Sequence, residues 1–210
     1  MDYSANRAEL CGSFVTLPEP SHVNHGQTFY HFYLAVERLS GCTDVLRVVV
    51  PERTLKRTEL ECGDMLFVRG QVRSYSESSE RGRRLRIFVF ADELECRQGE
   101  PLNDIALTGV ISRAPVLRRT PLGREICDLM LRVGRGFRRS DYLPVIAWGR
   151  TARTIADARG GDTLELSGRL QSREYTKNLD GVPEKRTAYE ISVLSARLFE
   201  DVSDIFPENS

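Results

Sequence analysis

Short segments in which apolar and polar residues alternate make up most of the chain. In the clearest of them, D-Y-L-P-V-I-A-W, Leu143, Val145 and Ala147 share one face, while Tyr142 and Trp148 lie at the two ends of the other face. Alternation with a period of two is typical of a β-strand that buries one side. The segment ends at a glycine, and the residues after it have a helical composition. These patterns predict a mainly β protein with short helices.

The order of these segments repeats along the chain. With a shift of 97 residues, Gly12 coincides with Gly109, and the run L-R-V-V at 46–49 coincides with L-P-V-I at 143–146. One insertion then makes the shift 98, and further glycines continue to coincide. Because turn residues and apolar positions agree together, the repeat indicates a duplicated domain.

Each copy predicts three strands, a short helix and two more strands. In the first copy the strands are expected at 9–16, after Gly26, at 45–50, 65–74 and 85–93, and the helix at 52–61; in the second copy the strands are expected at 106–113, after Gly123, at 142–148, 163–175 and 187–199, and the helix at 151–159. A proline-containing turn follows the first strand, and a polar loop precedes the last one. This order is that of the OB-fold, a five-stranded, partly open barrel whose strand face and long loops bind oligonucleotides. The predicted fold class is all-β, with two tandem OB-folds, each with a short helix between strands 3 and 4; another small β-barrel or sandwich is the alternative.

The two predicted domains are residues 1–98 and 101–200. The segment between them, R-Q-G-E-P-L, is too short to be a flexible tether, so the barrels should be in contact. Residues 201–210 are polar and acidic apart from three apolar side chains, and we expect them to be disordered.

Composition narrows the class of protein further. The chain has no run of 18 apolar residues and no apolar segment near its N-terminus, so we expect neither a membrane span nor a secretory signal. Its five cysteines never form C-x-x-C, which favours reduced thiols in a cytoplasmic protein. The formal net charge is zero, but residues 1–100 sum to −2, residues 101–199 to +6 and residues 200–210 to −4. The basic excess, nearly all arginine, is weak support for a polyanionic partner.

The inventory of reactive side chains argues against an enzyme. All three histidines lie in the first copy, and His22 and His25 fall in an expected turn, P-S-H-V-N-H-G. No cysteine spacing supplies a zinc cluster, and no phosphate loop or nucleophile motif is present. We therefore expect no catalytic residues, no metal and no cofactor.

The second copy instead has aromatic side chains at strand ends and loops, with arginines among them. The aromatic residues are Phe137, Tyr142, Trp148, Tyr175 and Tyr189, and the arginines are Arg132, Arg135, Arg138, Arg139, Arg150, Arg169 and Arg173. Rings stack on bases of any identity, and guanidinium groups pair with phosphates. The pattern favours a groove for an unpaired nucleic-acid strand over a duplex site, which would need an inserted recognition helix.

Residues 103–199 resemble the bacterial single-stranded DNA-binding protein family and its PriB relatives. The motifs that carry the resemblance are N-D-I-A-L-T-G, A-P-V-L-R-R-T-P-L-G, D-Y-L-P-V-I-A-W-G-R-T-A, G-G-D-T-L-E-L-S-G-R-L-Q-S-R-E-Y and Y-E-I-S-V. The resemblance implies that four aromatic positions stack on DNA bases, and these fall on Phe137, Tyr142, Trp148 and Tyr175. With the seven arginines they form the predicted DNA-binding site.

The first copy departs from this pattern. The counterparts of the first three aromatic positions are Ser40, Val45 and Pro51, although the copy has its own cluster F-Y-H-F-Y at 29–33. We therefore expect the first barrel to be a scaffold or oligomerisation half and the second to be the main DNA reader.

The resemblance also implies partners. Family members assemble four barrels, so two barrels in one chain suggest a homodimer. They often end in an acidic tail whose last residue is Phe; here D-I-F is followed by P-E-N-S, which places tail-mediated recruitment of replication or repair proteins in doubt. The expected function is sequence-independent binding of single-stranded DNA in replication, recombination or repair, in the bacterial cytoplasm at the nucleoid. The alternatives are a PriB-like component of replication restart and a protein-assembly module whose OB-folds do not bind DNA.

Overall fold

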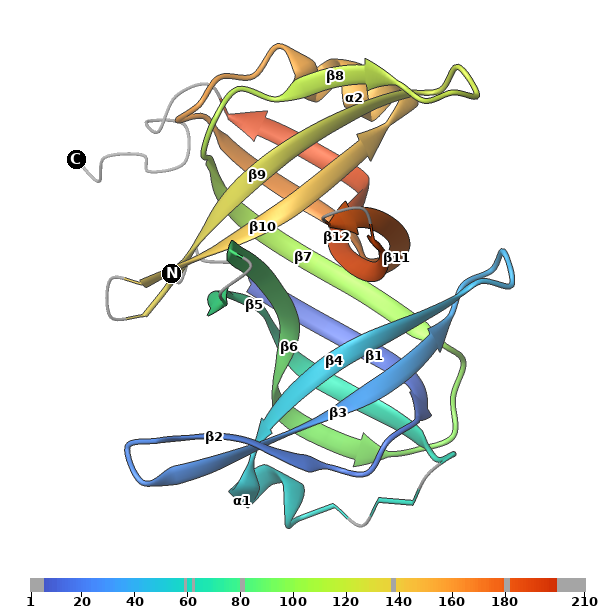
Figure 1. The fold of residues 1–210 in the computed structure, drawn as a ribbon, viewed down its shortest axis with the longest axis vertical. Helices are drawn as coiled ribbons and strands as arrows, with labels where there is room; N and C mark the ends of the chain where they lie inside the picture. The colour runs from blue at the N-terminus through green and yellow to red at the C-terminus, as the bar shows by residue number, and fades with distance from the viewer. Residues whose placement is uncertain are drawn as a thin grey trace, which may run out of the picture.

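Two β-barrels of the same design form the molecule (Figure 1). The computed structural model describes residues 6–58, 60–61, 63–79, 82–136, 139–179 and 182–199. The first barrel contains β1 (Asn6–Phe14), β2 (Glu19–Asn24), β3 (Gln27–Glu37), β4 (Thr43–Pro51), α1 (Glu52–Leu55), β5 (Met65–Ser79) and β6 (Gly82–Cys96). The second contains β7 (Leu102–Ile111), β8 (Val116–Arg119), β9 (Glu125–Arg135), β10 (Arg139–Trp148), α2 (Gly149–Ala156), β11 (Thr163–Leu179) and β12 (Val182–Phe199). The expected tail at 201–210 lies outside the described residues.

Both barrels close in the same way. In the first, β1 pairs with both β3 and β5, and β4 runs parallel to β6. In the second, β7 pairs with both β9 and β11, and β10 runs parallel to β12. The helix of each copy follows the third long strand. The predicted tandem OB-folds, each with a helix between strands 3 and 4, are confirmed.

Each barrel has one strand more than the sequence pattern predicted. The proline-containing turns were expected to lead directly into the next strand, but β2 and β8 lie there and form hairpins with β3 and β9. The turn expected to hold His22 and His25 is mostly strand. Only His25 and Gly26 form the loop, and both have positive φ, 48° and 73°, as a two-residue hairpin turn requires.

The last two strands of each barrel are longer than predicted. The polar loop expected before the last strand is largely absorbed into the hairpins β5–β6 and β11–β12, which remain paired beyond the barrel as far as Ser79↔Gly82 and Leu179↔Val182. The polar, glycine-containing composition suggested a loop, but residues on a hairpin that extends into solvent need no apolar face. The first helix is shorter than expected and ends at Leu55.

A β-bulge bends the fourth long strand of each barrel. The register shifts between Arg69 and Gly70 in β5 and between Ser167 and Gly168 in β11. A Cβ atom at Gly70 would lie 1.9 Å from the carbonyl oxygen of Phe90, so only glycine permits this approach. The coinciding glycines of the sequence repeat therefore mark the bend that closes each barrel.

Apolar side chains on the inner strand faces fill both barrels. Fully buried residues include Leu10, Phe32 and Leu46 in the first barrel and Leu107 and Leu143 in the second. Each contributes about 1.5–3 kcal/mol relative to an exposed position. The core therefore accounts for the inward half of the alternating pattern and leaves the outer faces for other roles.

The two barrels share one continuous sheet, because β1 pairs antiparallel with β7 from Asn6↔Leu107 to Cys11↔Leu102. Reciprocal side-chain contacts add to this junction. The carboxylate of Asp44 accepts a hydrogen bond from the Ser172 amide at 2.7 Å, and that of Asp141 accepts one from the Ser74 amide at 2.7 Å. The predicted contact between the barrels is confirmed.

Candidate nucleic-acid interface

The strand β10 presents two aromatic rings on its outer face. Tyr142 and Trp148 are 46% and 38% exposed, whereas Leu143, Val145 and Ala147 between them are buried. The predicted outward position of the two rings is therefore confirmed, although Ile146, which lies between them on the same face, is buried. Six residue steps of extended strand separate the backbone positions of the two rings by about 20 Å. The outer face of β10 thus offers a ring at each end.

Arg132 lies beside Tyr142, because β9 and β10 pair these two residues directly. Both side chains are exposed. The Arg132 side chain makes no hydrogen bond or ion pair with the described residues. A ring and an unengaged guanidinium side by side can contact a base and the adjoining phosphate.

Trp148 lines a shallow cavity of about 580 Å³ with the β8–β9 turn and the start of α2. Arg119, Arg124 and Arg153 line it too. Glu125 accepts hydrogen bonds from Arg153 and Arg119, and these arginines lower the pKa of its carboxyl, Arg153 most. The sequence interpretation omitted these three arginines, although two of them flank the turn in R-R-T-P-L-G-R.

Tyr175 lies on the long hairpin of the second barrel and is 36% exposed. The Arg173 guanidinium carbon is 5.8 Å from the centre of the Tyr175 ring. Arg169 precedes Arg173 by four residues, so it lies on the same face of β11. Arg150 is exposed on α2. Phe137 and Arg138, also predicted, lie outside the described residues.

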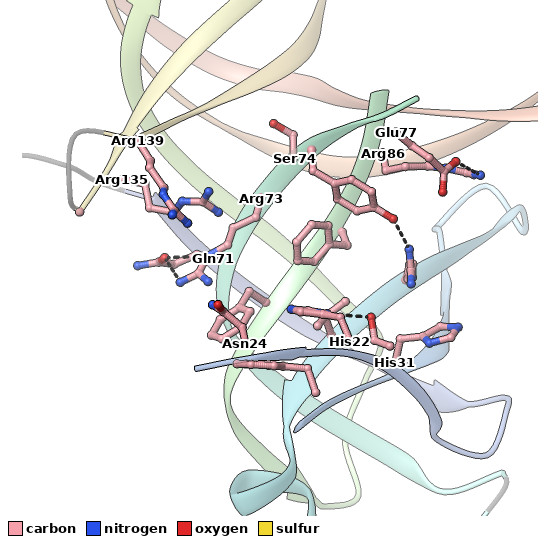
Figure 2. Close-up of a pocket in the computed structure, with 18 of the residues that line it drawn as sticks. His22, Asn24, His31, Gln71, Arg73, Ser74, Glu77, Arg86, Arg135 and Arg139 are labelled. Carbon is pink, nitrogen blue, oxygen red and sulfur yellow. Dashed lines mark hydrogen bonds and ion pairs between the residues drawn. The ribbon is translucent and has the colours of Figure 1, made fainter. Parts of the chain in front are cut away.

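Arg135 and Arg139 lie elsewhere than predicted. The sequence grouped them with the second barrel, but the β9–β10 hairpin carries them to a groove on the first barrel (Figure 2). This groove has a volume of about 1110 Å³ and covers the outer faces of β3, β4, β5 and β6. The first barrel therefore has a concave surface to which the second contributes charge.

The groove combines rings with arginines. Its lining includes Phe29, Tyr33, Tyr75, Phe88 and Phe90, together with Arg47, Arg73, Arg86, Arg135 and Arg139. Among the described lining residues the one acidic side chain, Glu77, is ion-paired with Arg86 at 2.6 Å. The surface is thus aromatic and strongly positive, although residues 1–100 as a whole sum to −2.

The rings of the groove form a small apolar cluster separate from the barrel core. Phe29 and Phe88 pack around Val49, and His22 stacks on Phe29 with 4.7 Å between ring centres. Tyr75 remains 41% exposed. Part of the aromatic surface is therefore internally packed, and Tyr75 remains the most accessible of the five rings.

Period-two alternation could have revealed this groove. In F-Y-H-F-Y, Phe29 and Tyr33 face outward while Phe32 is fully buried, and R-I-F-V-F places Phe88 and Phe90 on the outer face of β6. The comparison with the second copy obscured it, because the first barrel carries its rings on β3, β5 and β6 rather than on β4.

Other kinds of site are not found in the described parts of the chain. No group of three or more His, Cys, Asp or Glu side chains there is placed to hold a metal ion. None of the described helices is long and apolar enough to cross a bilayer.

The fold and the ring-bearing surfaces define a tandem OB-fold protein of the oligonucleotide-binding class. Residues 102–199 match the single-strand binding protein family. The match covers the second barrel, whose motifs predicted the resemblance.

The similarity to individual proteins extends over both barrels. The single-stranded DNA-binding protein of Thermus thermophilus is 28% identical over 203 residues, which cover 82% of this chain and 77% of that protein. The Thermus aquaticus protein is 31% identical over 140 residues, covering 57% of this chain and 53% of that protein. The wild-type Thermus aquaticus crystal structure superposes with a TM-score of 0.73 at 25% identity over 92% of each chain, and a deletion variant gives 0.76 over all of both chains.

Proposed function

We propose that the chain binds single-stranded DNA without base specificity and performs no catalysis. The observation that carries the proposal is the exposure of Tyr142 and Trp148 at the two ends of a strand whose inner face is buried. The fold does not require these rings, because Val45 and Pro51 fill the corresponding positions of β4. Relatives of similar sequence and fold are named as single-stranded DNA-binding proteins.

In the second barrel, bases stack on Tyr142, Trp148 and Tyr175, each stack contributing about 1–3 kcal/mol. Phosphates pair with the arginines around them. The arginines that we propose for this contact are Arg132, Arg150, Arg169 and Arg173 from the predicted set, with Arg119, Arg124 and Arg153 added near Trp148. Phe137 remains in the proposal on the family resemblance, and Arg138 on its place among the arginines of the sequence.

The first barrel was expected to be a scaffold or oligomerisation half. Its aromatic, arginine-lined groove argues against a purely structural role, so we assign it a share of the DNA contact. Its part in oligomerisation remains a proposal, as do the homodimer with four barrels and the use of the protein in replication, recombination or repair. Recruitment of partner proteins through residues 201–210 is likewise a proposal.

The single tryptophan makes the proposal directly testable. Titration of the full chain with oligo-dT should quench Trp148 fluorescence, and the affinity should fall steeply as salt rises, because phosphate neutralisation releases counterions. A Trp148→Phe variant, followed by anisotropy of a labelled oligo-dT, should still bind and separates loss of signal from loss of binding. Unchanged fluorescence together with unchanged anisotropy at low salt would refute DNA binding and favour a protein-assembly module.

A further inference from the structure

Resting on the proposed function, we propose that Arg73, Arg135 and Arg139 form a phosphate-binding site at the junction of the two barrels. Its ligand is the phosphodiester backbone of a strand that lies in the first barrel's groove. Arg73 comes from β5, whereas Arg135 ends β9 and Arg139 begins β10. Neither barrel alone contains the site.

The three guanidinium groups gather at one end of the groove (Figure 2). Arg73 is held in place there, because its Nε and Nη2 donate to Gln71 Oε1 at 3.3 and 3.0 Å and its guanidinium carbon lies 3.6 Å from the centre of the Phe90 ring. Arg139 is exposed, and its side chain makes no hydrogen bond or ion pair with any described residue. One arginine of the cluster is thus fixed in position and another retains all its donors.

The charges of the cluster are not balanced locally. Burial lowers the pKa of Arg73, and the positive charge of Arg135 lowers it further, while Asp92 and Asp141 raise it. Among the described residues, these two carboxylates against three guanidinium groups leave an excess of positive charge. An anionic group between the arginines would relieve their mutual repulsion and supply acceptors for several N–H groups at once.

The corresponding position in the first barrel shows that the fold does not require this arrangement. Arg38 aligns with Arg135, and it donates to Asp44 through Nε at 2.7 Å and Nη2 at 2.5 Å and to the Ser172 carbonyl at 3.2 Å. Arg135 makes no such hydrogen bonds with described residues, and its Nη1 lies 3.5 Å from Asp141 Oδ1. The Arg38–Asp44 pair is therefore closed by two hydrogen bonds. The Arg135–Asp141 ion pair is longer, and it leaves the guanidinium N–H groups of Arg135 without a hydrogen bond to any described residue.

The other two members of the cluster also have no equivalent at that end of the junction. The counterpart of Arg139 is Cys42, and the counterpart of Arg73 is Gln171, which donates to Glu190 at 2.9 Å. Strand pairing and barrel closure are the same in both halves, so they do not explain why this arginine cluster is present at one end of the junction and its counterpart is missing at the other. We therefore attribute the cluster to the groove that it lines.

The position of the cluster gives it a role in the path of the strand. Next to it, Ser74 Oγ accepts a hydrogen bond from the Tyr142 amide at 2.8 Å, so the groove of the first barrel and the ring-bearing strand of the second meet there. A phosphate held by the three arginines would allow one strand to continue from the groove to Tyr142. The cluster therefore links the two barrels into one binding surface.

The test compares salt dependence in the full chain. Binding of fluorescein-labelled oligo-dT is followed by anisotropy over a salt series for the wild type, Arg139→Gln and the double variant R135Q/R139Q. Each lost phosphate contact should reduce the slope of log K against log salt by roughly 0.7, and Arg139→Lys should restore most of the slope. Arg57→Gln removes an exposed charge that does not line the groove and should leave the slope unchanged.

The outcomes separate this inference from the proposed function. Wild-type slopes in both Arg139→Gln and R135Q/R139Q, with Trp148 quenching intact, would overturn the phosphate site and leave DNA binding standing. Absence of quenching and of binding in the wild type would instead overturn the proposed function. Because the Arg139 side chain is exposed and makes no hydrogen bond or ion pair with a described residue, Arg139→Gln provides a test that does not depend on the folding of the double variant.

Discussion

Replacing Asp44 with alanine should destabilise the junction of the two barrels strongly. The Asp44 carboxylate is 1% exposed and accepts hydrogen bonds from the Arg38 guanidinium and from the amide and hydroxyl of Ser172. These groups come from both barrels. The substitution therefore removes the acceptor around which one end of the junction is built.

The magnitude follows from the groups left without a partner. An unsatisfied buried amide costs about 1–3 kcal/mol, and that of Ser172 is partly buried. Breaking a buried ion pair costs about 3–5 kcal/mol. The side chain of Arg38 is 24% exposed and can regain some water, so we expect a total loss of about 3 kcal/mol. For a chain of this size that loss lowers Tm by about 6–12 °C.

Differential scanning calorimetry of Asp44→Ala and Asp104→Ala measures this effect against a matched control. Asp104 also joins the barrels, through Arg7 at 2.9 Å, but its side chain is 37% exposed, and a surface pair contributes only about 0–1 kcal/mol. The double variant R38A/D44A should lose less stability than the two single variants summed, because it leaves no guanidinium unpaired. A melting point of Asp44→Ala within about 2 °C of that of the control, which corresponds to about 1 kcal/mol or less, would refute the reasoning.

Three further predictions concern the binding face, the bulge and pH. Tyr142→Ala should weaken oligo-dT binding roughly 5- to 150-fold, the loss of one stacked base, as measured by anisotropy. Gly70→Ala should cost about 3 kcal/mol in thermal unfolding, because the new methyl group would collide with the Phe90 carbonyl and push β5 from β6. Burial, and then the charge of Arg47, lowers the pKa of His31; the unfolded chain therefore takes up this proton first, and stability in thermal melts should fall as pH drops below 6.5.

Each of these predictions has a control within the chain. Leu39→Ala changes an exposed side chain that lines neither cavity and should not alter DNA affinity. Gly134→Ala places a methyl group where nothing lies within 4 Å, so a loss of stability equal to that of Gly70→Ala would contradict the steric argument. His31→Gln should flatten the pH dependence of the melting temperature. If the melting temperature of this variant still falls below pH 6.5 as in the wild type, other groups cause the decline.

The sequence predicted the architecture well, because the features that define it are local and occur twice. Inner-face residues such as Leu143 and Val145 report strand periodicity directly, and the coinciding glycines at 70 and 168 mark the bends that close the barrels. The extra strands β2 and β8 were missed because their burial patterns are almost entirely exposed, so no alternation distinguishes them from turns.

The candidate site was only partly predictable. The outward positions of Tyr142 and Trp148 follow from alternation, whereas the place of Arg135 depends on how the β9–β10 hairpin meets the other barrel, which no local pattern encodes. The first barrel's groove was missed for a related reason. Its rings come from strands distant in sequence, such as Phe29 in β3 and Phe88 in β6, and only the closed barrel brings them together.

The reciprocal contacts Asp44–Ser172 and Asp141–Ser74 relate the two barrels by an approximate two-fold axis. Two identical barrels meeting about such an axis would have to carry the same residues at both ends of their interface. Because the two barrels are parts of one chain, their sequences can differ. One end of the interface carries the hydrogen-bonded Arg38–Asp44 pair, and the other carries the longer Arg135–Asp141 ion pair. The two orientations of a linear ligand with distinct 5′ and 3′ ends are then no longer equivalent, so the pair of barrels can favour one polarity of the bound strand.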